Sequence, residues 1–167
     1  MTWYEADNYC GKLGGFLAEP INKGEGSFLR HKANKLPETN WWIGLRQFEK
    51  CHCISQDGSK TIISAFTKPD TLQWHTTNGL NGLGETTCPD EYQKYCSGFE
   101  WRWGLSGEKM EYKYWDTYDG QPNNVENDHC VTMGYKDVNQ RWINWSCDEK
   151  GENYRRMTFK PVCQKNT

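Results

Sequence analysis

Residues Trp115 to Cys147 read WDTYDGQPNNVENDHCVTMGYKDVNQRWINWSC, and this stretch decides the fold of the chain. It combines a Gly-Gln-Pro-Asn turn at residues 120–123 with a polar loop, three tryptophans and two cysteines. A loop rich in side-chain oxygens, with a turn fixed by Pro122, offers the acceptors that a hard cation or a sugar needs. Taken alone, the residues fit a solvated surface loop closed by a disulfide equally well.

Length and composition predict one aromatic-rich domain. The 167 residues can bury a single core without help from a metal or a partner subunit. Hydrophobic residues make up only 35%, so the 9 Trp, 9 Tyr and 6 Phe must supply much of that core. No apolar run approaches the roughly 20 residues of a membrane-spanning helix, so we expect no membrane insertion. A net charge of -2 without a basic stripe argues against nucleic acid as a partner.

The eight cysteines most simply form four disulfides, which indicates an oxidising compartment and a secreted or extracellular protein. A zinc site is a weaker interpretation, because only Cys51-His52-Cys53 brings ligands close together and this spacing is unusual for zinc. Cys51 and Cys53 are too close to pair comfortably with each other. We expect them to pair with Cys88 and Cys96, in an order that the sequence does not fix.

Two helices are predicted near the N-terminus. Thr2 and Glu5 have the spacing of a capping box, which satisfies the first free amides of a helix. The apolar face of that helix would contain Trp3, Ala6, Cys10 and Leu13. A second helix is expected to start near Asn22 and to end before Pro37, because the residue before proline avoids helical angles.

Short strands are predicted for most of the remaining chain. A buried strand is expected at residues 40–45 and a half-buried one at 100–103. Further candidates are 130–133, 141–145 and 157–163. The predicted fold class is α+β, with two helices, small and mostly antiparallel sheets, and a long loop region.

An insertion is predicted at about residues 46–98, where Gly, Thr, Ser and Asn become frequent and NGLNGLG marks consecutive turns. A structureless loop of this length would be unusual in a compact domain, so we expect a disulfide-stapled subdomain or a functional insertion. It has too few aliphatic residues for a core of its own. We expect a separate lobe that offers a contact surface to another protein chain.

These features together resemble the C-type lectin-like domain over nearly the whole chain outside the insertion. The matching motifs, in order, are WYEADNYC, GGFLAEP, WIGL, WRWG, QPNN and PVCQ. The resemblance implies one domain over residues 1–167, with Cys10 paired to Cys163 and Cys130 paired to Cys147. In sugar-binding members of the family, three motifs hold one calcium ion, and the sugar hydroxyls complete its coordination.

Carried over to this chain, the resemblance implies calcium ligands and sugar contacts at Gln121, Asn123, Asp128 and Asn144. Ile143 stands where the family has an amide ligand, and Asn144 stands where it has a carboxylate. Asp128 is thus the one carboxylate left in the set, and calcium affinity rises with the number of charged oxygen ligands. Asp119 and Glu126 lie nearby in sequence.

Three further positions carry predictions. Glu25 matches an acidic ligand of the family's auxiliary calcium position, while Gln164 stands where glutamate is usual. Asn144-Trp145-Ser146 is an N-x-S sequon, which we expect to be accidental if Asn144 is buried. His129 is expected to face solvent. None of the four histidines has the neighbours of a known nucleophile motif, which argues against an enzyme.

The leading functional hypothesis is an extracellular carbohydrate-binding module with a weakened calcium site and a glycan or glycoprotein as partner. The alternative is a calcium-independent module for protein interaction or structure on the same scaffold. Ile143 and Asn144 favour the alternative, and the retained turn at Pro122 favours the first.

Overall fold

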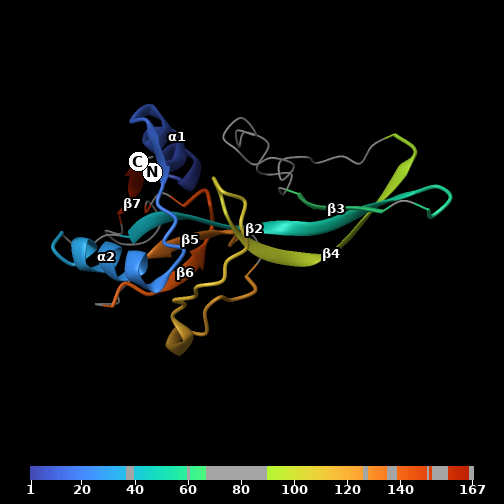
Figure 1. Cartoon of the computed structure of the whole chain (residues 1–167). Coiled ribbons are helices and arrows are strands. Elements are labelled where there is room, and N and C mark those ends of the chain that lie inside the picture. The colour runs from blue at the N-terminus through green and yellow to red at the C-terminus, as the bar shows by residue number, and fades with distance from the viewer. Residues whose placement is uncertain are drawn as a thin grey trace. The chain divides into compact units, whose positions relative to one another are not determined.

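The computed structural model describes residues 1–36, 40–59, 61–66, 90–125, 128–134, 139–149, 151 and 158–165. The chain divides into two compact units (Figure 1). The scaffold unit comprises Met1–Arg46 and Met110–Thr167, and the insertion unit comprises Gln47–Lys109. The insertion unit therefore extends beyond residue 98, where the change in composition ends.

Helix α1, Trp3–Lys12, begins at the predicted capping box. The Thr2 hydroxyl accepts a hydrogen bond from the Glu5 N–H at 3.1 Å, and the Glu5 carboxylate accepts one from the Thr2 N–H at 2.8 Å. The buried residues of the helix are Trp3, Ala6 and Cys10. Leu13 is 52% exposed, so its prediction as part of this face was wrong. The helix ends one residue earlier, and Leu13 is its C-cap.

The glycines after α1 are required by the backbone. Gly14 has a φ of 75°, in the left-handed region that costs other residues free energy. Gly15 opens strand β1, Gly15–Leu17, which pairs with β8, Cys163–Lys165. A Cβ at Gly15 would collide with the main-chain oxygen of Gln164.

We therefore expect Gly15→Ala to lower the free energy of unfolding by about 1–3 kcal/mol, because the backbone of β8 has to move. Gly11→Ala is the matched control. Gly11 lies inside α1 with nothing within 4 Å of its would-be Cβ, so the variant should gain about 1 kcal/mol. Urea unfolding of both variants measures the difference, and equal stabilities would contradict the close approach at Gly15.

Helix α2, Lys23–Ala33, starts where the sequence predicts, with Asn22 as N-cap. The Asn22 side chain accepts a hydrogen bond from the Glu25 N–H at 3.0 Å. Arg30 joins this helix to the chain that follows the insertion unit. Its guanidinium donates to the Tyr112 hydroxyl at 3.1 Å and lies 3.8 Å from the ring centroid of Tyr114.

The central sheet of the scaffold unit is built on the first part of β2, Asn40–Ser55. This part pairs antiparallel with β5, Cys130–Met133, and parallel with β7, Phe159–Pro161. Strand β5 also pairs with β6, Trp142–Trp145, and all four of its residues are buried. The predicted strands are thus present, although 157–163 contains all of β7 and the first residue of a second strand, β8, and Met157 lies outside the described residues.

The pairing of β2 with β5 contains an irregularity that positions a charged side chain. Ile43 pairs with Val131, but the next partner, Cys130, pairs with Arg46. Gly44 lies within the irregularity, and its N–H donates to the main-chain oxygen of Ala18 at 2.8 Å. As a result Arg46 stands opposite Cys130, and it is only 1% exposed.

The insertion unit contains strands where the sequence suggested an irregular region. The second part of β2 pairs antiparallel with β3, Thr61–Phe66, and β2 also pairs with β4, Tyr92–Trp103. The predicted strand at 100–103 is the end of β4. The NGLNGLG turns lie outside the described residues.

Both disulfides of the scaffold unit have the pairing that the resemblance implies. Cys10 is bonded to Cys163, and Cys130 is bonded to Cys147. None of these four cysteines is therefore available to the insertion unit.

In the insertion unit, Cys53 and Cys96 are each disulfide-bonded. The side chain of Cys51 and the whole of Cys88 lie outside the described residues. The pairing order of these four cysteines therefore stays open.

Candidate functional site

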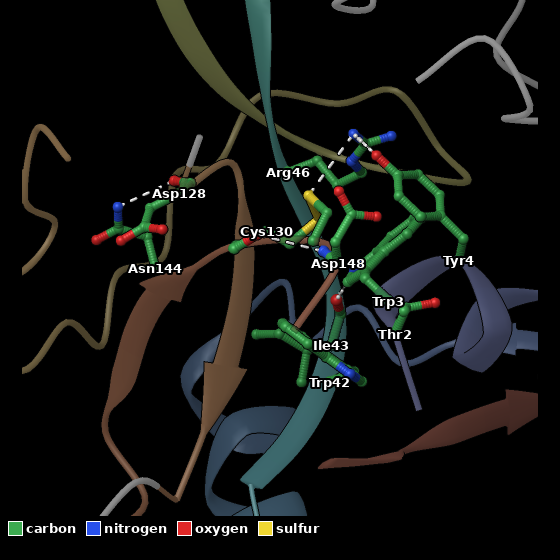
Figure 2. The surroundings of a disulfide bond; sticks show 12 residues. Thr2, Trp3, Tyr4, Trp42, Ile43, Arg46, Asp128, Cys130, Asn144 and Asp148 are labelled. Carbon is green, nitrogen blue, oxygen red and sulfur yellow. Dashed lines mark hydrogen bonds between the residues drawn. A yellow bond between two sulfur atoms is a disulfide. The ribbon is translucent and has the colours of Figure 1, made fainter. Parts of the chain in front are cut away.

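The structure brings the four predicted site residues together, with Asn144 on β6 at their centre. The Asn144 N–H donates to the Gln121 side-chain oxygen at 3.3 Å, and the Asn123 N–H donates to Asn144 Oδ1 at 2.9 Å. Asn144 Nδ2 in turn donates to Asn123 Oδ1 at 2.9 Å and to the main-chain oxygen of Asn123 at 3.1 Å. It also donates to the main-chain oxygen of Asp128 at 3.0 Å (Figure 2). We call these four residues the amide cluster.

The side-chain amides of the amide cluster form the hydrogen bonds that hold the loop on strand β6. Each of the three amide oxygens, on Gln121, Asn123 and Asn144, accepts an N–H from within the protein. Asn144 is 1% exposed and Gln121 is 8% exposed, so neither presents its oxygen to solvent. A buried amide that satisfies its donors and acceptors in this way stabilises one loop conformation.

Asp128 contributes the one carboxylate of the amide cluster. Its desolvation by burial raises the pKa of this carboxyl from 3.8 to about 6. Burial thus makes the charged form less favourable than in water, although a carboxyl with a pKa of about 6 is still mostly ionised at pH 7.

This raised pKa predicts a pH dependence of stability in the presence of a chelator. The folded state binds the proton more tightly than the unfolded state, so Asp128 stabilises the fold below pH 4. That contribution is lost as the pH rises through about 6. Asp128→Asn should remove this slope and should be more stable than the wild type at pH 7.5. Urea unfolding at pH 4.5, 6 and 7.5 measures the free energy of unfolding of both proteins. An equal change of this free energy with pH in the two proteins would contradict the raised pKa.

The residues of the amide cluster do not fit the oxygen cage that calcium requires. Calcium takes six to eight oxygen ligands, several of them usually carboxylates. Ile143, at the position of a family ligand, is an apolar residue 1% exposed. Asp119 lies at the end of the exposed 3-10 helix η2, Thr117–Asp119, and Glu126 lies outside the described residues. Across the part of the chain that the structure describes, no group of three or more His, Cys, Asp and Glu could hold a metal ion.

The residues matched to the auxiliary calcium position are also engaged elsewhere. The Glu25 carboxylate accepts a hydrogen bond from the Ile21 N–H at 3.0 Å, at the start of α2. The Gln164 side-chain oxygen accepts one from the Glu19 N–H at 3.2 Å.

The burial of His129 and of Asn144 tests two further predictions from the sequence. His129 is 5% exposed, so the prediction that it faces solvent was wrong; it directly precedes the fully buried strand β5. The sequon at Asn144 has its acceptor nitrogen buried, with its two hydrogens shared among three oxygen acceptors. This nitrogen cannot carry a glycan in the folded protein.

Sequence reasoning missed Arg46. Its guanidinium carbon lies 4.8 Å from the ring centroid of Trp3 and 5.4 Å from that of Tyr4. Nη2 donates to the Tyr4 hydroxyl at 3.4 Å and contacts Cys147 Sγ at 3.9 Å (Figure 2). Arg46 thereby joins the start of α1 to the Cys130–Cys147 disulfide. The only signal in the sequence is a charged residue directly after an apolar strand, which ordinarily marks a strand end.

Comparison with known proteins identifies the family. The Lectin C-type domain model matches residues 1–88, more than half of the 167 residues. The chain therefore belongs to the C-type lectin domain family. It is 24% identical to lithostathine of Rattus norvegicus over 151 residues, which cover 89% of this chain and 61% of that protein. The chain thus spans less than two thirds of the length of this relative.

Solved structures agree with this fold. Human lithostathine has a TM-score of 0.50 at 21% identity, covering 89% of this chain and 77% of that one. A crystal structure of human lithostathine at 1.3 Å resolution also has a TM-score of 0.50, at 22% identity over 89% and 70%. The C-type lectin-like fold and its α+β class, predicted from the sequence, are confirmed. No helix in the described residues has the length and apolar character needed to cross a bilayer.

Proposed function

We propose that this chain is an extracellular recognition module of the C-type lectin family that binds its partner without calcium. The observation that carries the proposal is the side chain of Asn144. It stands where the family uses a calcium-binding carboxylate, but it is buried and fully hydrogen-bonded to the loop that it holds. In this arrangement the hydrogen bonds of an amide hold the loop that a metal ion would otherwise hold.

The extracellular location is supported by the disulfides. Cys10–Cys163 joins α1 to β8, Cys130–Cys147 joins β5 to the residues after β6, and such bonds persist in oxidising compartments. The absence of a nucleophile motif in the sequence supports binding rather than catalysis.

The loop tied down by Asn144 would provide the contact surface. Tyr118 is 88% exposed on η2, with the Arg141 guanidinium carbon 5.0 Å from its ring centroid. Val125, at the other end of the loop, is 55% exposed. Exposed aromatic and apolar side chains on a fixed loop supply contact area at little entropic cost, whether the partner is a glycan or a protein.

A glycan array run in calcium and in chelator tests the proposal. We expect the same signals in both conditions, and silence in both would count against a glycan as the partner. A signal that the chelator abolishes would instead support the calcium-dependent sugar site at Gln121, Asn123, Asp128 and Asn144, which stays a prediction.

Tyr118→Ala tests the contact surface once a partner is in hand. It should weaken binding while leaving the thermal midpoint unchanged, because the side chain is almost fully exposed. Leu13→Ala, which truncates a 52% exposed residue on α1, is the matched control and should bind normally. Contact with a protein partner through the insertion unit stays a separate prediction.

A further inference from the structure

The outer face of α2 carries a line of cationic and apolar side chains. Its members, here called the α2 stripe, are Phe28, His31, Lys32, Lys35 and Leu36. They are spaced three and four residues apart, so they lie on one side of the helix. The helical path continues beyond Ala33, because the N–H groups of Lys35 and Leu36 donate to the carbonyls of Lys32 and Ala33. All five side chains are exposed, Phe28 by 61% and Leu36 by 53%.

The other side of α2 is fixed to the scaffold unit. Ala33 is 5% exposed, and Arg30 is held by Tyr112 and Tyr114. The Asn34 side-chain oxygen accepts a hydrogen bond from Gln140 Nε2 at 3.1 Å. The stripe is therefore presented on a rigid support, which lowers the entropic cost of binding.

The lysines of the stripe have no ionic partner among the residues that the structure describes. Within the described part of the chain, neither Lys32 nor Lys35 lies within 4 Å of a carboxylate, and the ion pairs found there are Arg102–Glu100 and Lys109–Glu100. The one acidic residue of α2, Glu25, accepts a hydrogen bond from the Ile21 N–H in the first turn of the helix, seven residues before Lys32. The positive charges of Lys32 and Lys35 are thus available to an anionic ligand.

We propose that the α2 stripe binds a sulfated polysaccharide chain through Lys32 and Lys35. Charge complementarity points to a polyanion, and the disulfides place the chain where extracellular polysaccharides occur. An anionic lipid surface fits less well, because those lipids give the cytoplasmic leaflet its negative potential. The stripe shares no residue with the loop at Tyr118, so the inference goes beyond the proposed function and survives its failure.

Binding to immobilised heparin tests the inference, with the full chain compared to Lys32→Gln/Lys35→Gln. We expect the double variant to bind on the order of 30-fold more weakly, since each lysine near an anionic surface contributes about 1 kcal/mol. The affinity of the wild type should fall as salt is added. Lys12→Gln/Lys165→Gln is the matched control, because it removes two exposed cations elsewhere on the scaffold unit. Thermal unfolding confirms that all variants are folded.

Four outcomes would overturn the inference. These are no heparin binding by the wild type, equal loss in both double variants, equal binding of desulfated heparin, or a preference for phosphatidylserine vesicles over heparin. Tyr118→Ala should leave heparin binding unchanged, and this separates the α2 stripe from the proposed recognition loop.

Discussion

Replacing Cys10 and Cys163 together by alanine is expected to lower the free energy of unfolding by about 5 kcal/mol. The bond joins α1 to β8 across 153 residues, so its removal frees most of the unfolded chain. A domain of this kind is typically stable by about 5–15 kcal/mol, so the variant should keep no more than about 10 kcal/mol and should unfold at a lower temperature than the wild type.

The second scaffold disulfide is the internal comparison. Cys130 and Cys147 are 17 residues apart, and the same chain-entropy relation gives about 3 kcal/mol for Cys130→Ala/Cys147→Ala. Urea unfolding followed by circular dichroism measures both losses. A larger loss from the short loop than from the long one would show that contacts at the disulfide, such as that of Arg46 with Cys147, outweigh the entropy of loop closure.

Asn144→Asp is expected to destabilise the protein by about 3 kcal/mol at pH 7 in chelator. The change keeps the shape of the side chain but removes its N–H donors. A buried carboxylate would then face three oxygens, two on Asn123 and one on Asp128. The loss should shrink at acidic pH, because a protonated carboxyl regains a donor.

Asn124→Asp is the matched control for this substitution. Asn124 is exposed on the same loop, so adding a charge there should change stability by no more than about 0.5 kcal/mol. If the two variants are equally stable in chelator, Asn144 does not hold the loop in the way described.

Local chemistry made the regular elements predictable. The capping box at Thr2 and Glu5 determines the start of α1, and the apolar run at 130–133 indicates β5. Each of these signals is contained within a few consecutive residues. The end of β2 was not predictable. Its second part is rich in polar residues, and its pairing with β3 and β4 depends on segments distant in sequence.

The role of each site residue was harder to predict than its position. The sequence placed Asn144 beside Gln121 and Asn123 through the family resemblance, and the structure brings them together. Whether an amide binds a metal or a loop depends on donors and acceptors about twenty residues away, which no local pattern reveals. Arg46 was missed for a similar reason, since the irregular pairing with β5 buries it.

Calcium titration calorimetry on the metal-free full chain tests the central claim most directly. A site with a Kd of about 1 mM would release measurable heat and would stabilise the fold by about 1.4 kcal/mol at about 10 mM calcium. A calcium-independent module should show no binding heat over this range, and its thermal midpoint should be equal in calcium and in chelator. A one-site isotherm at millimolar or tighter affinity, lost in Asp128→Asn, would contradict the claim.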